Sequence, residues 1–364
     1  MYDVIIVGGG PAGATLARLL GRSRKVLLIE RRYIKENGEG DFKKCCGGLV
    51  APDAQRLLAE FGLGIPGEVL DGPQLFAVRT IDQGNNLERY YQRHYVNVNR
   101  EKFDRWLLSQ VSACVEVEDG SMFKNYMDFG KYVQATYLKD GEEIVATAKL
   151  LVGADGASSR VRRRLYPNKN GQRRYIAIQE YFRLTYNQPY YGSIFDKEIT
   201  DFYSWTIPKE GYLVVGSALD PYNEPLKKFE ELKGKLEGKG FDLGESFGKN
   251  SAYLLRPRGS REILTGKGRV ALIGEAAGWI SPSSAEGLSY GFKSALNLSG
   301  AIEENIERAA TLYRKKSKSL YLNIKWKGIK SFLMYNDYTR HMIMKSGVMS
   351  MGSIKEKLAE TGII

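Results

Sequence analysis

Two short aliphatic and β-branched runs lie close to the amino terminus, with a helical pattern between them. Residues 3–7 and 25–29 are almost continuously apolar, which is typical of strands buried on both faces of a parallel sheet. Small and aliphatic residues recur at helical spacing from Ala14 to Leu20. The pattern therefore predicts a strand–helix–strand unit at the start of the chain.

Further along the chain the pattern predicts a second kind of sheet. Apolar runs at 149–152 and 268–273 predict two more buried strands of the first sheet. From 171 to 258 the sequence changes to period-two alternation with many aromatic residues, and 73–89 has a similar character. Strands of this alternating kind are expected at 175–182, 202–207 and 212–217. Alternation favours an antiparallel sheet that is inserted into the first domain.

We therefore expect an α/β fold. It combines a Rossmann-like dinucleotide-binding domain, an inserted antiparallel-sheet substrate domain and a C-terminal helical segment. The dinucleotide-binding domain is predicted to be discontinuous, with pieces at 1–71, 93–165 and 262–310. The substrate domain is expected at 72–92 and 166–261, and the helical segment at 311–364.

A glycine motif joins the first predicted strand to the first predicted helix. Gly8, Gly10 and Gly13 form G-x-G-x-x-G, and Glu30 ends the second predicted strand. Gly8 allows a tight turn, Gly10 lets the backbone approach a pyrophosphate, and Gly13 lets the helix pack closely on the strand. Glu30 is expected to accept hydrogen bonds from the adenosine ribose. NAD and FAD both use this motif, so the motif alone leaves both cofactors open.

The cysteine and histidine content limits the chemistry. The chain has three cysteines, Cys45, Cys46 and Cys114, and two histidines, His94 and His341. This number excludes a disulfide framework and four-cysteine metal sites, so we expect no metal. The amino terminus lacks the pattern of a signal peptide, and no apolar stretch of about 18 residues occurs. The expected localisation is cytoplasmic, either free or peripheral at a membrane surface.

The formal net charge of +12 is concentrated in two clusters, at 160–174 and 314–345. Such clusters favour an anionic partner: a phospholipid surface, a phosphorylated substrate or an acidic electron donor. No nucleic-acid-binding motif accompanies them, so nucleic acid is not expected. Residues 314–345 hold nine Lys or Arg and one acid, mixed with aromatic and aliphatic residues. This composition fits a membrane-surface helix or, alternatively, a helix that packs on the dinucleotide domain.

Five segments together resemble the geranylgeranyl reductase family of FAD-dependent oxidoreductases, which share the fold of the aromatic hydroxylases. They are the glycine motif with Glu30, the Cys46-Gly47-Gly48 loop, the helix led by Arg100, residues 153–162, and residues 274–288. The resemblance extends from about residue 3 to 306 and implies an FAD-binding domain. Ala285 stands where the family often has glycine, and Glu275 where it has aspartate.

The resemblance also implies roles for individual residues. Those expected to bind FAD are Gly8, Gly10, Pro11, Ala12, Gly13, Glu30, Arg31, Lys44, Cys45, Gly47, Arg100, Asp155, Glu275, Gly287 and Leu288. Glu30 and the glycine motif are implied to hold the ADP half, and Arg100 the extended middle of the cofactor. Gly287 and Leu288 would direct backbone N–H groups towards the flavin, where they stabilise negative charge.

Three residues are candidates for the catalytic face: Cys46, Tyr203 and Trp205. Tyr203 and Trp205 share one face of a predicted strand, so they form either an aromatic wall over the flavin or ordinary sheet core. Cys46 is either a proton donor beside the flavin or a buried thiol without function. The glycine-rich stretch at 234–244 is expected to be a surface loop, which leaves no second dinucleotide domain.

The expected function is FAD-dependent reduction of carbon–carbon double bonds in an isoprenoid lipid or prenyl diphosphate. The expected partners are an isoprenoid or other apolar small molecule and an external electron donor, either NADPH or a reduced carrier protein. The alternative is a flavin-dependent monooxygenase or halogenase of an aromatic small molecule, because residues 205–208 (WTIP) also resemble a halogenase element. A third interpretation is a flavin-carrying, membrane-associated binding protein without catalytic activity.

Overall fold

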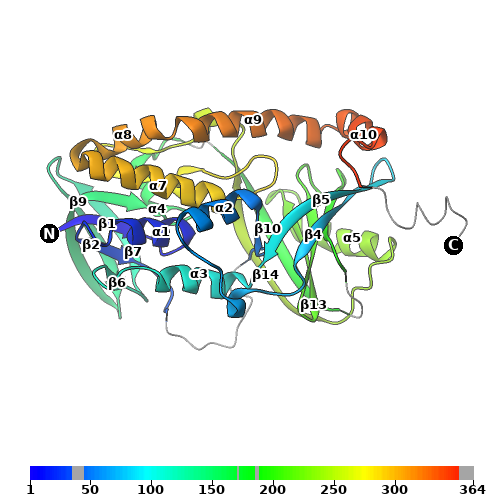
Figure 1. The fold of residues 1–364 in the computed structure, drawn as a ribbon, viewed down its shortest axis with the longest axis horizontal. Coiled ribbons are helices and arrows are strands. Elements are labelled where there is room, and N and C mark those ends of the chain that lie inside the picture. Colours follow the sequence, from blue (N-terminus) through cyan, green and yellow to red (C-terminus); the bar gives the residue numbers. More distant parts are fainter. Residues whose placement is uncertain (35–44, 170–171, 185–187, 352–364) are drawn as a thin grey trace, which may run out of the picture.

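The computed structural model describes residues 1–34, 45–169, 172–184 and 188–351. Within these residues, two sheets lie side by side along the long axis of the molecule, with helices around them (Figure 1). The fold is α/β with two sheets and a helical C-terminal segment, as predicted. The helices are α1 (Pro11–Leu20), α2 (Pro52–Glu60), α3 (Arg100–Ser109), α4 (Arg160–Leu165), α5 (Pro225–Glu237), α6 (Gly274–Ala277), α7 (Leu288–Glu304), α8 (Ala309–Lys316), α9 (Lys318–Tyr335) and α10 (Asp337–Ser346).

The first sheet has a parallel centre in the order β16-β9-β1-β2-β6. Its strands are β1 (Tyr2–Val7), β2 (Val26–Ile29), β6 (Glu116–Glu118), β7 (Met122–Asp128), β8 (Val133–Lys139), β9 (Glu142–Gly153), β15 (Gly266–Lys267) and β16 (Val270–Leu272). Side chains of β1 pack alternately into two cores, with Ile6 against α1 and α7 and Ile5 on the side of the β7–β8 hairpin. Burial on both faces explains why β1 and β2 are continuously apolar.

The second sheet has the order β14-β10-β13-β12-β11-β4-β5-β3 and is antiparallel except for the parallel pair β11–β4. Its strands are β3 (Leu49–Val50), β4 (Leu75–Asp82), β5 (Leu87–Asn97), β10 (Arg173–Arg183), β11 (Tyr191–Phe195), β12 (Ser204–Lys209), β13 (Tyr212–Leu219) and β14 (Ser246–Arg256). One face packs against α5, and the other carries a cluster rich in aromatic residues that includes Tyr175, Trp205 and the aliphatic Val214. The second face is the one that matters for the site.

The prediction of a surface loop at 234–244 is wrong for the first part of this stretch. Gly234 lies inside α5, whose Phe229, Leu232 and Leu236 are buried against the second sheet. The helix ends at its C-cap, Gly238, and Gly240 follows with a positive φ of 81°. The apolar residues at i, i+3 and i+7 bury enough surface to stabilise a helix despite Gly234 and the many lysines.

The C-terminal segment forms three consecutive helices along one edge of the molecule, where a single basic helix was expected (Figure 1). The chain leaves helical geometry at Asn336, whose side chain accepts a hydrogen bond from the Thr339 N–H and so begins α10. Among the described helices, none is both long enough and apolar enough to cross a bilayer.

Candidate functional site

The glycine motif forms the turn that the sequence predicts. Gly8 has a φ of 103°, and a Cβ at this position would lie 2.6 Å from the carbonyl oxygen of Ala154. A Cβ at Gly13 would lie 1.9 Å from the Gly8 carbonyl oxygen, so only glycine lets α1 begin this close to β1. A Cβ at Gly10 would meet nothing within 4 Å, so space is open at the amino terminus of α1. Pro11 and Ala12 follow as the first residues of that helix.

Glu30 closes the same turn from the end of β2. Its carboxylate accepts hydrogen bonds from the Gly9 N–H at 2.6 Å and from the backbone and Nε of Arg32 at 3.0 and 2.9 Å. Burial alone would raise the pKa of Glu30, but the Arg32 charge and these hydrogen bonds outweigh it and lower the pKa. The buried carboxylate is therefore ionised at the edge where the ribose is expected.

Arg32 is a site residue that the sequence analysis missed in favour of its neighbour Arg31. Arg31 is exposed, whereas Arg32 pairs with Glu30 and approaches Asp104 of α3 at 3.5 Å. The chain turns immediately after Glu30, so one residue of offset decides which arginine faces the carboxylates.

Asp155 and Glu275 follow the ends of β9 and β16. Asp155 is positioned as predicted to order its turn, since its carboxylate accepts from the Ser159 hydroxyl at 2.5 Å and the Arg160 N–H at 2.7 Å. Burial raises the pKa of Asp155, and it outweighs these hydrogen bonds, which act to lower the pKa. Glu275 accepts from the Leu255 N–H at 3.1 Å, so one of its oxygens joins α6 to β14. Its expected contact with the ribityl chain stays a prediction.

The Cys46-Gly47-Gly48 loop lies where the two sheets meet. The Cys46 sulfur is 3.0 Å from Nη1 of Arg100, which begins α3 and pairs through Nε with Asp104 at 2.8 Å. A Cβ at Gly47 would lie 2.3 Å from Cδ1 of Ile207 on β12. The loop therefore brings a thiol from the first half of the chain against the aromatic face of the second sheet.

Lys209 supports this loop and was not predicted. Its ammonium is buried and donates to Asn97 Oδ1 at 2.6 Å and to the Val98 carbonyl at 2.8 Å, and lies 3.5 Å from Asp71. Burial lowers the pKa of Lys209, while Asp71 opposes that shift. Gly48, with a φ of 68°, packs against the same ammonium, since a Cβ there would lie 2.8 Å from Nζ.

Cys45 faces away from Arg100 and towards β10. Its thiol donates to the Ala177 carbonyl at 3.5 Å, and burial raises its pKa to about 12. The adjacent cysteines thus have different environments, and Cys45 is a thiol at neutral pH. Lys44, which was predicted beside it, lies outside the described residues.

Tyr203 and Trp205 form part of an aromatic wall. Their ring centroids are 5.4 Å apart, and both belong to a cluster with Tyr95, Tyr191 and Tyr335. The Tyr203 hydroxyl donates to the Ser284 carbonyl at 2.9 Å, which ties the wall to the loop before α7. Both rings are thus packed in a core of the second sheet, and their expected placement over the flavin stays a prediction.

Two buried polar groups lie within this wall. Gln179 on β10 is directly opposite Gly216 on β13, and Gly216 is directly opposite Trp205. A Cβ at Gly216 would lie 2.4 Å from the Trp205 indole nitrogen, so the ring lies over this glycine. Within the described part of the chain, the Trp205 Nε1 and both amide atoms of Gln179 have no hydrogen-bond partner. Buried groups of this kind normally have one, so a polar atom of a ligand is the missing partner that this geometry suggests.

The amino terminus of α7 lies where the sequence predicts it. Gly287 is the N-cap and Leu288 the first helical residue. The preceding Ala285 has a φ of 52°, a left-handed conformation that glycine adopts more readily than alanine. Gly274 of α6 fits closely on α1, since its Cβ would lie 2.9 Å from the Ala12 Cβ.

These contacts bring most of the predicted residues to one end of the parallel strands. Glu30 contacts Gly9, Asp155 packs on Gly8, Arg100 contacts Cys46, and Tyr203 reaches the loop before Gly287. The carboxyl ends of parallel strands are where such folds bind dinucleotides. The missed residues Lys209 and Gln179 had no motif that could have identified them, because each gains its role from a distant segment. Arg32 pairs with the nearby Glu30, but the sequence does not show that the turn directs Arg32, and not Arg31, towards this carboxylate.

Comparison with known proteins agrees with this geometry. Residues 1–188 match the family described as FAD binding domain. The chain is 40% identical to the protein CbrA of Escherichia coli O6:H1, over 98% of this chain and 96% of that protein. A solved geranylgeranyl bacteriochlorophyll reductase-like protein from Thermoplasma acidophilum is similar with a TM-score of 0.81 and 19% identity, covering 98% of this chain and 95% of that one.

A second solved structure has a different described activity. It is PqsL, a probable FAD-dependent monooxygenase from Pseudomonas aeruginosa, with a TM-score of 0.67 and 20% identity over 94% of this chain and 99% of that one. At these identities the solved structures establish the fold. The cofactor is FAD, as predicted, and the open space at Gly10 beside the α1 amino terminus fits its pyrophosphate.

Proposed function

We propose, from the premise that this chain belongs to the FAD binding domain family, that it reduces carbon–carbon double bonds of an isoprenoid lipid or prenyl diphosphate. The chain is an FAD-dependent oxidoreductase. The substrate class is the part that we propose, and it is supported by the chemistry around Cys46 and by the apolar wall that faces it.

The observation that carries the proposal is the contact between Cys46 and Arg100. Reduction of an isolated double bond needs a hydride at one carbon and a proton at the other, and reduced FAD supplies the hydride when it is bound. The Cys46 sulfur lies 3.0 Å from the Arg100 guanidinium, whose positive charge stabilises the thiolate left after a proton is donated. Cys46 is therefore suited to deliver the proton.

Arg100 is held so that it can act on Cys46. Its Nε is engaged by Asp104, which is buried, and this ion pair orients Nη1 towards the sulfur. On the other side of the loop, Lys209 donates to the Val98 carbonyl, and the Val98 N–H donates to the Gly48 carbonyl. The thiol is thus positioned by charged groups from α3 and β12, which is more support than a buried cysteine without function requires.

The aromatic wall suits an elongated apolar substrate. Tyr203, Trp205 and the neighbouring tyrosines present ring surface, and Ile207 adds an aliphatic contact next to Gly47. The unpaired Trp205 N–H and Gln179 amide favour a substrate that also carries a polar atom. A prenyl chain that ends in a polar head group has both properties.

Electrons are proposed to come from an external donor, either NADPH or a reduced carrier protein. The glycine-rich stretch at 234–244 begins in α5 and continues past its end, and the described part of the chain contains one parallel sheet of the dinucleotide-binding kind. NADPH would therefore bind transiently.

The alternative is oxygen-dependent chemistry on an aromatic small molecule by a monooxygenase or halogenase. The fold of PqsL supports it, and so does an aromatic wall, which suits a planar substrate. The two functions differ in their need for oxygen, so a single preparation can distinguish them.

The test is anaerobic photoreduction of the FAD-loaded protein, addition of prenyl lipids or prenyl diphosphates, and mass analysis of the products. A gain of two hydrogens per double bond without oxygen supports the proposal. An oxygenated or halogenated product that forms only in air contradicts it.

The Cys46→Ser variant tests the proton donor. We expect it to keep FAD and to slow substrate reduction about a hundredfold, which is typical for loss of a general acid. Cys114→Ser is the matched control, because Cys114 is exposed and remote from the site. Equal turnover of Cys46→Ser and Cys114→Ser would remove Cys46 from the mechanism.

A further inference from the structure

Helix α9 carries apolar residues on two opposite faces. Leu320 and Ile324 point inwards and are buried against the first sheet. On the opposite face, Leu322, Trp326 and Ile329 are 58%, 70% and 54% exposed, and Phe332 and Leu333 continue this surface at 68% and 38%. The spacing of four, three and four residues places Leu322, Trp326, Ile329 and Leu333 along one line of the helix. Packing within the chain explains the inner stripe and leaves the outer one without a partner among the described residues.

Helix α10 extends this surface beyond the end of α9. Tyr338, Met342 and Ile343 are exposed, and Val348 and Met349 follow the end of the helix. We call these residues and those of the outer stripe of α9 the α9–α10 surface. Exposed apolar residues this numerous on consecutive helices exceed the scattered ones that a soluble surface normally has. Aromatic side chains among them (Trp326, Phe332 and Tyr338) suit the boundary between water and lipid.

The charge on this surface has one sign. Helix α9 contains four lysines and no acidic residue. Lys325 and Lys330 lie on either side of the outer stripe by their helical positions, and both are exposed. The acid that begins α10, Asp337, is engaged by Arg340 at 2.8 Å and by Lys197 at 2.6 Å, so its charge is compensated. An apolar stripe between lysines complements an anionic surface with an apolar interior.

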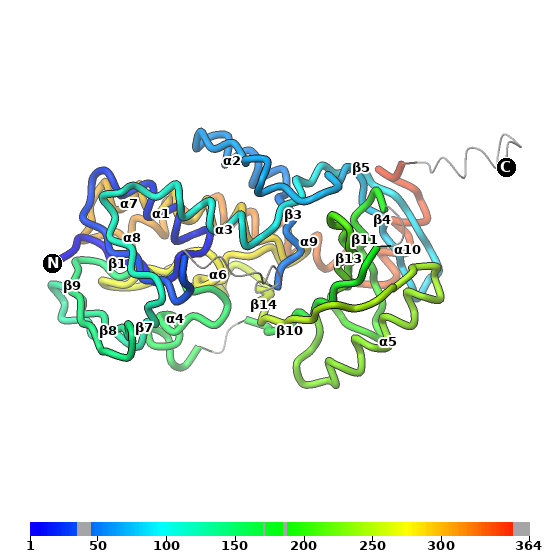
Figure 2. The backbone as a smooth tube through the Cα atoms, turned by 90° about the horizontal axis from the view of Figure 1, so that it is seen from below, coloured from blue at the N-terminus to red at the C-terminus, as the bar shows by residue number. Residues whose placement is uncertain are grey.

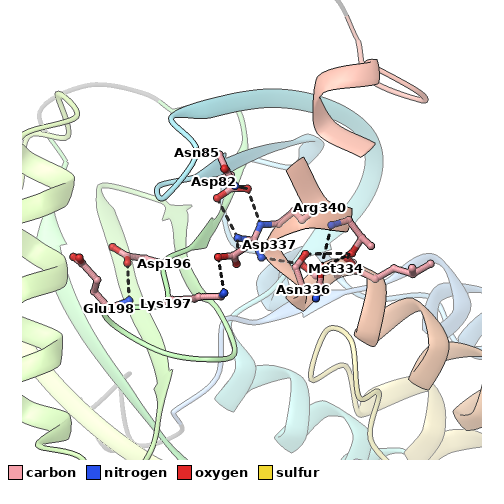
Figure 3. Close-up of polar contacts among 11 residues, drawn as sticks. Asp82, Asn85, Asp196, Lys197, Glu198, Met334, Asn336, Asp337 and Arg340 are labelled. Carbon is pink, nitrogen blue, oxygen red and sulfur yellow. Dashed lines mark hydrogen bonds and ion pairs between the residues drawn. The ribbon is translucent and has the colours of Figure 1, made fainter. Parts of the chain in front are cut away.

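The turn between α9 and α10 is anchored to the second sheet, as Figure 3 shows. Arg340 is buried and donates from Nε and Nη2 to the two oxygens of Asp82 at the end of β4, at 2.8 and 3.1 Å. Its Nη1 also donates to the Met334 carbonyl at 3.1 Å, which ties the end of α9 to α10. The α9–α10 surface is therefore presented in a fixed orientation along one edge of the molecule (Figure 1).

We infer that the α9–α10 surface docks onto an anionic phospholipid bilayer, with the outer stripe inserted at the level of the head groups. An apolar helix face could instead bind a second copy of the chain. Pairing of two acid-free helices would place lysines against lysines, which is unfavourable, whereas anionic lipids neutralise them. This inference does not depend on the proposed reaction, because the surface lies on the outside of the helices.

The test measures binding of the full FAD-loaded chain to vesicles of phosphatidylcholine with and without phosphatidylglycerol, by flotation. Binding to the anionic vesicles that weakens with salt is expected. The double variant Trp326→Ala/Ile329→Ala should lower the partition coefficient about a hundredfold, because each side chain contributes about tenfold through buried apolar area. Lys325→Glu should lower it about thirtyfold at low salt.

Matched controls are Tyr222→Ala, an exposed aromatic residue on the turn before α5, and Lys124→Glu on β7. Neither should change binding. Trp326 also provides a direct signal, since Trp205 and Trp279 are buried and the fourth tryptophan, Trp106 on α3, is half-buried, so that Trp326 is the most exposed of the four. Its fluorescence should shift to the blue on anionic vesicles, and this shift should be lost in Trp326→Phe although that variant still binds.

Three results would overturn the inference. They are absence of binding to anionic vesicles, equal binding by the double variant and wild type, or a dimer in light scattering that the double variant converts to monomer. Retention of FAD absorbance in every variant shows that the fold is intact, so a loss of binding can be assigned to the surface.

Discussion

Substitution of Gly48 by alanine tests whether the Cys46 loop depends on close contact with β12 and the end of β5. Gly48 has a φ of 68°, and a Cβ there would lie 2.2 Å from the Val98 carbonyl oxygen. The Val98 N–H donates to the Gly48 carbonyl at 2.8 Å, and Lys209 donates to the Val98 carbonyl at the same distance. An added methyl group would therefore push on the Val98 carbonyl oxygen, which the Lys209 ammonium holds in place, and would strain the hydrogen bond between the Val98 N–H and Gly48.

The size of the effect follows from these contacts. The left-handed conformation costs a residue with a side chain about 1–2 kcal/mol. Moving the loop by roughly an ångström weakens one neutral hydrogen bond and one from the Lys209 ammonium, which together contribute about 2–4 kcal/mol. Gly48→Ala should therefore lower the free energy of unfolding by about 3–6 kcal/mol.

Gly62→Ala is the matched control. Gly62 has nearly the same φ, 70°, but a Cβ there would meet nothing within 4 Å. It should lose only the conformational part, about 1–2 kcal/mol. The assay is urea denaturation at saturating FAD, followed by tryptophan fluorescence, together with turnover below the transition. If the two variants are equally destabilised, the proposed contact between Gly48 and Val98 does not constrain the loop.

Three further predictions concern other parts of the molecule. At pH 8 Cys114 should react with iodoacetamide readily and Cys45 should not, because a pKa of about 12 leaves almost no thiolate; peptide mass analysis that shows equal labelling would contradict this. Arg340→Met should destabilise the protein by about 3–5 kcal/mol because it leaves the buried Asp82 carboxylate unpaired, and the double variant with Asp82→Asn should recover part of the loss in a double-mutant cycle. Ala285→Gly should raise the free energy of unfolding by up to about 1 kcal/mol by relieving the left-handed alanine, whereas a decrease would show that this backbone is unstrained.

The parts of the site that could be predicted are those whose role is determined by residues close to them in the sequence. Gly8, Gly13 and Glu30 act through backbone geometry at the end of a strand, and a short motif specifies that geometry. The start of α3 was predictable for the same reason, since Asn99 caps the helix by accepting from the N–H groups of Glu101 and Lys102. In each case the partners are local or belong to the same strand–helix–strand unit.

Residues that gain their role from distant segments could not be predicted in this way. Lys209 follows a strand and precedes a Glu-Gly turn, which is the pattern of an exposed hairpin, yet Asn97 and Asp71 bury it. Gln179 occupies an ordinary position on β10, and its importance comes from Gly216 on the neighbouring strand β13 and Trp205 on the strand after that, β12. Strand order is set by packing of the whole sheet, so the pattern along one strand does not contain this information.

The C-terminal helices show another limit of prediction from sequence. Here the pattern of apolar residues offers more than one candidate for the buried face. Two apolar stripes on α9 satisfy helical periodicity equally well, so periodicity cannot say which stripe is buried. The inner stripe contains Leu320 and Ile324, which pack with Trp279 and Tyr290 of the first sheet's core, and the buried Arg340–Asp82 pair fixes the helix pair in that orientation. Once the inner stripe is assigned, Trp326 and its neighbours must face outwards, among lysines. The sequence alone left membrane contact and internal packing as alternatives. In the structure one stripe packs in the core and the other is exposed, and it is this exposed stripe that we propose to contact a bilayer.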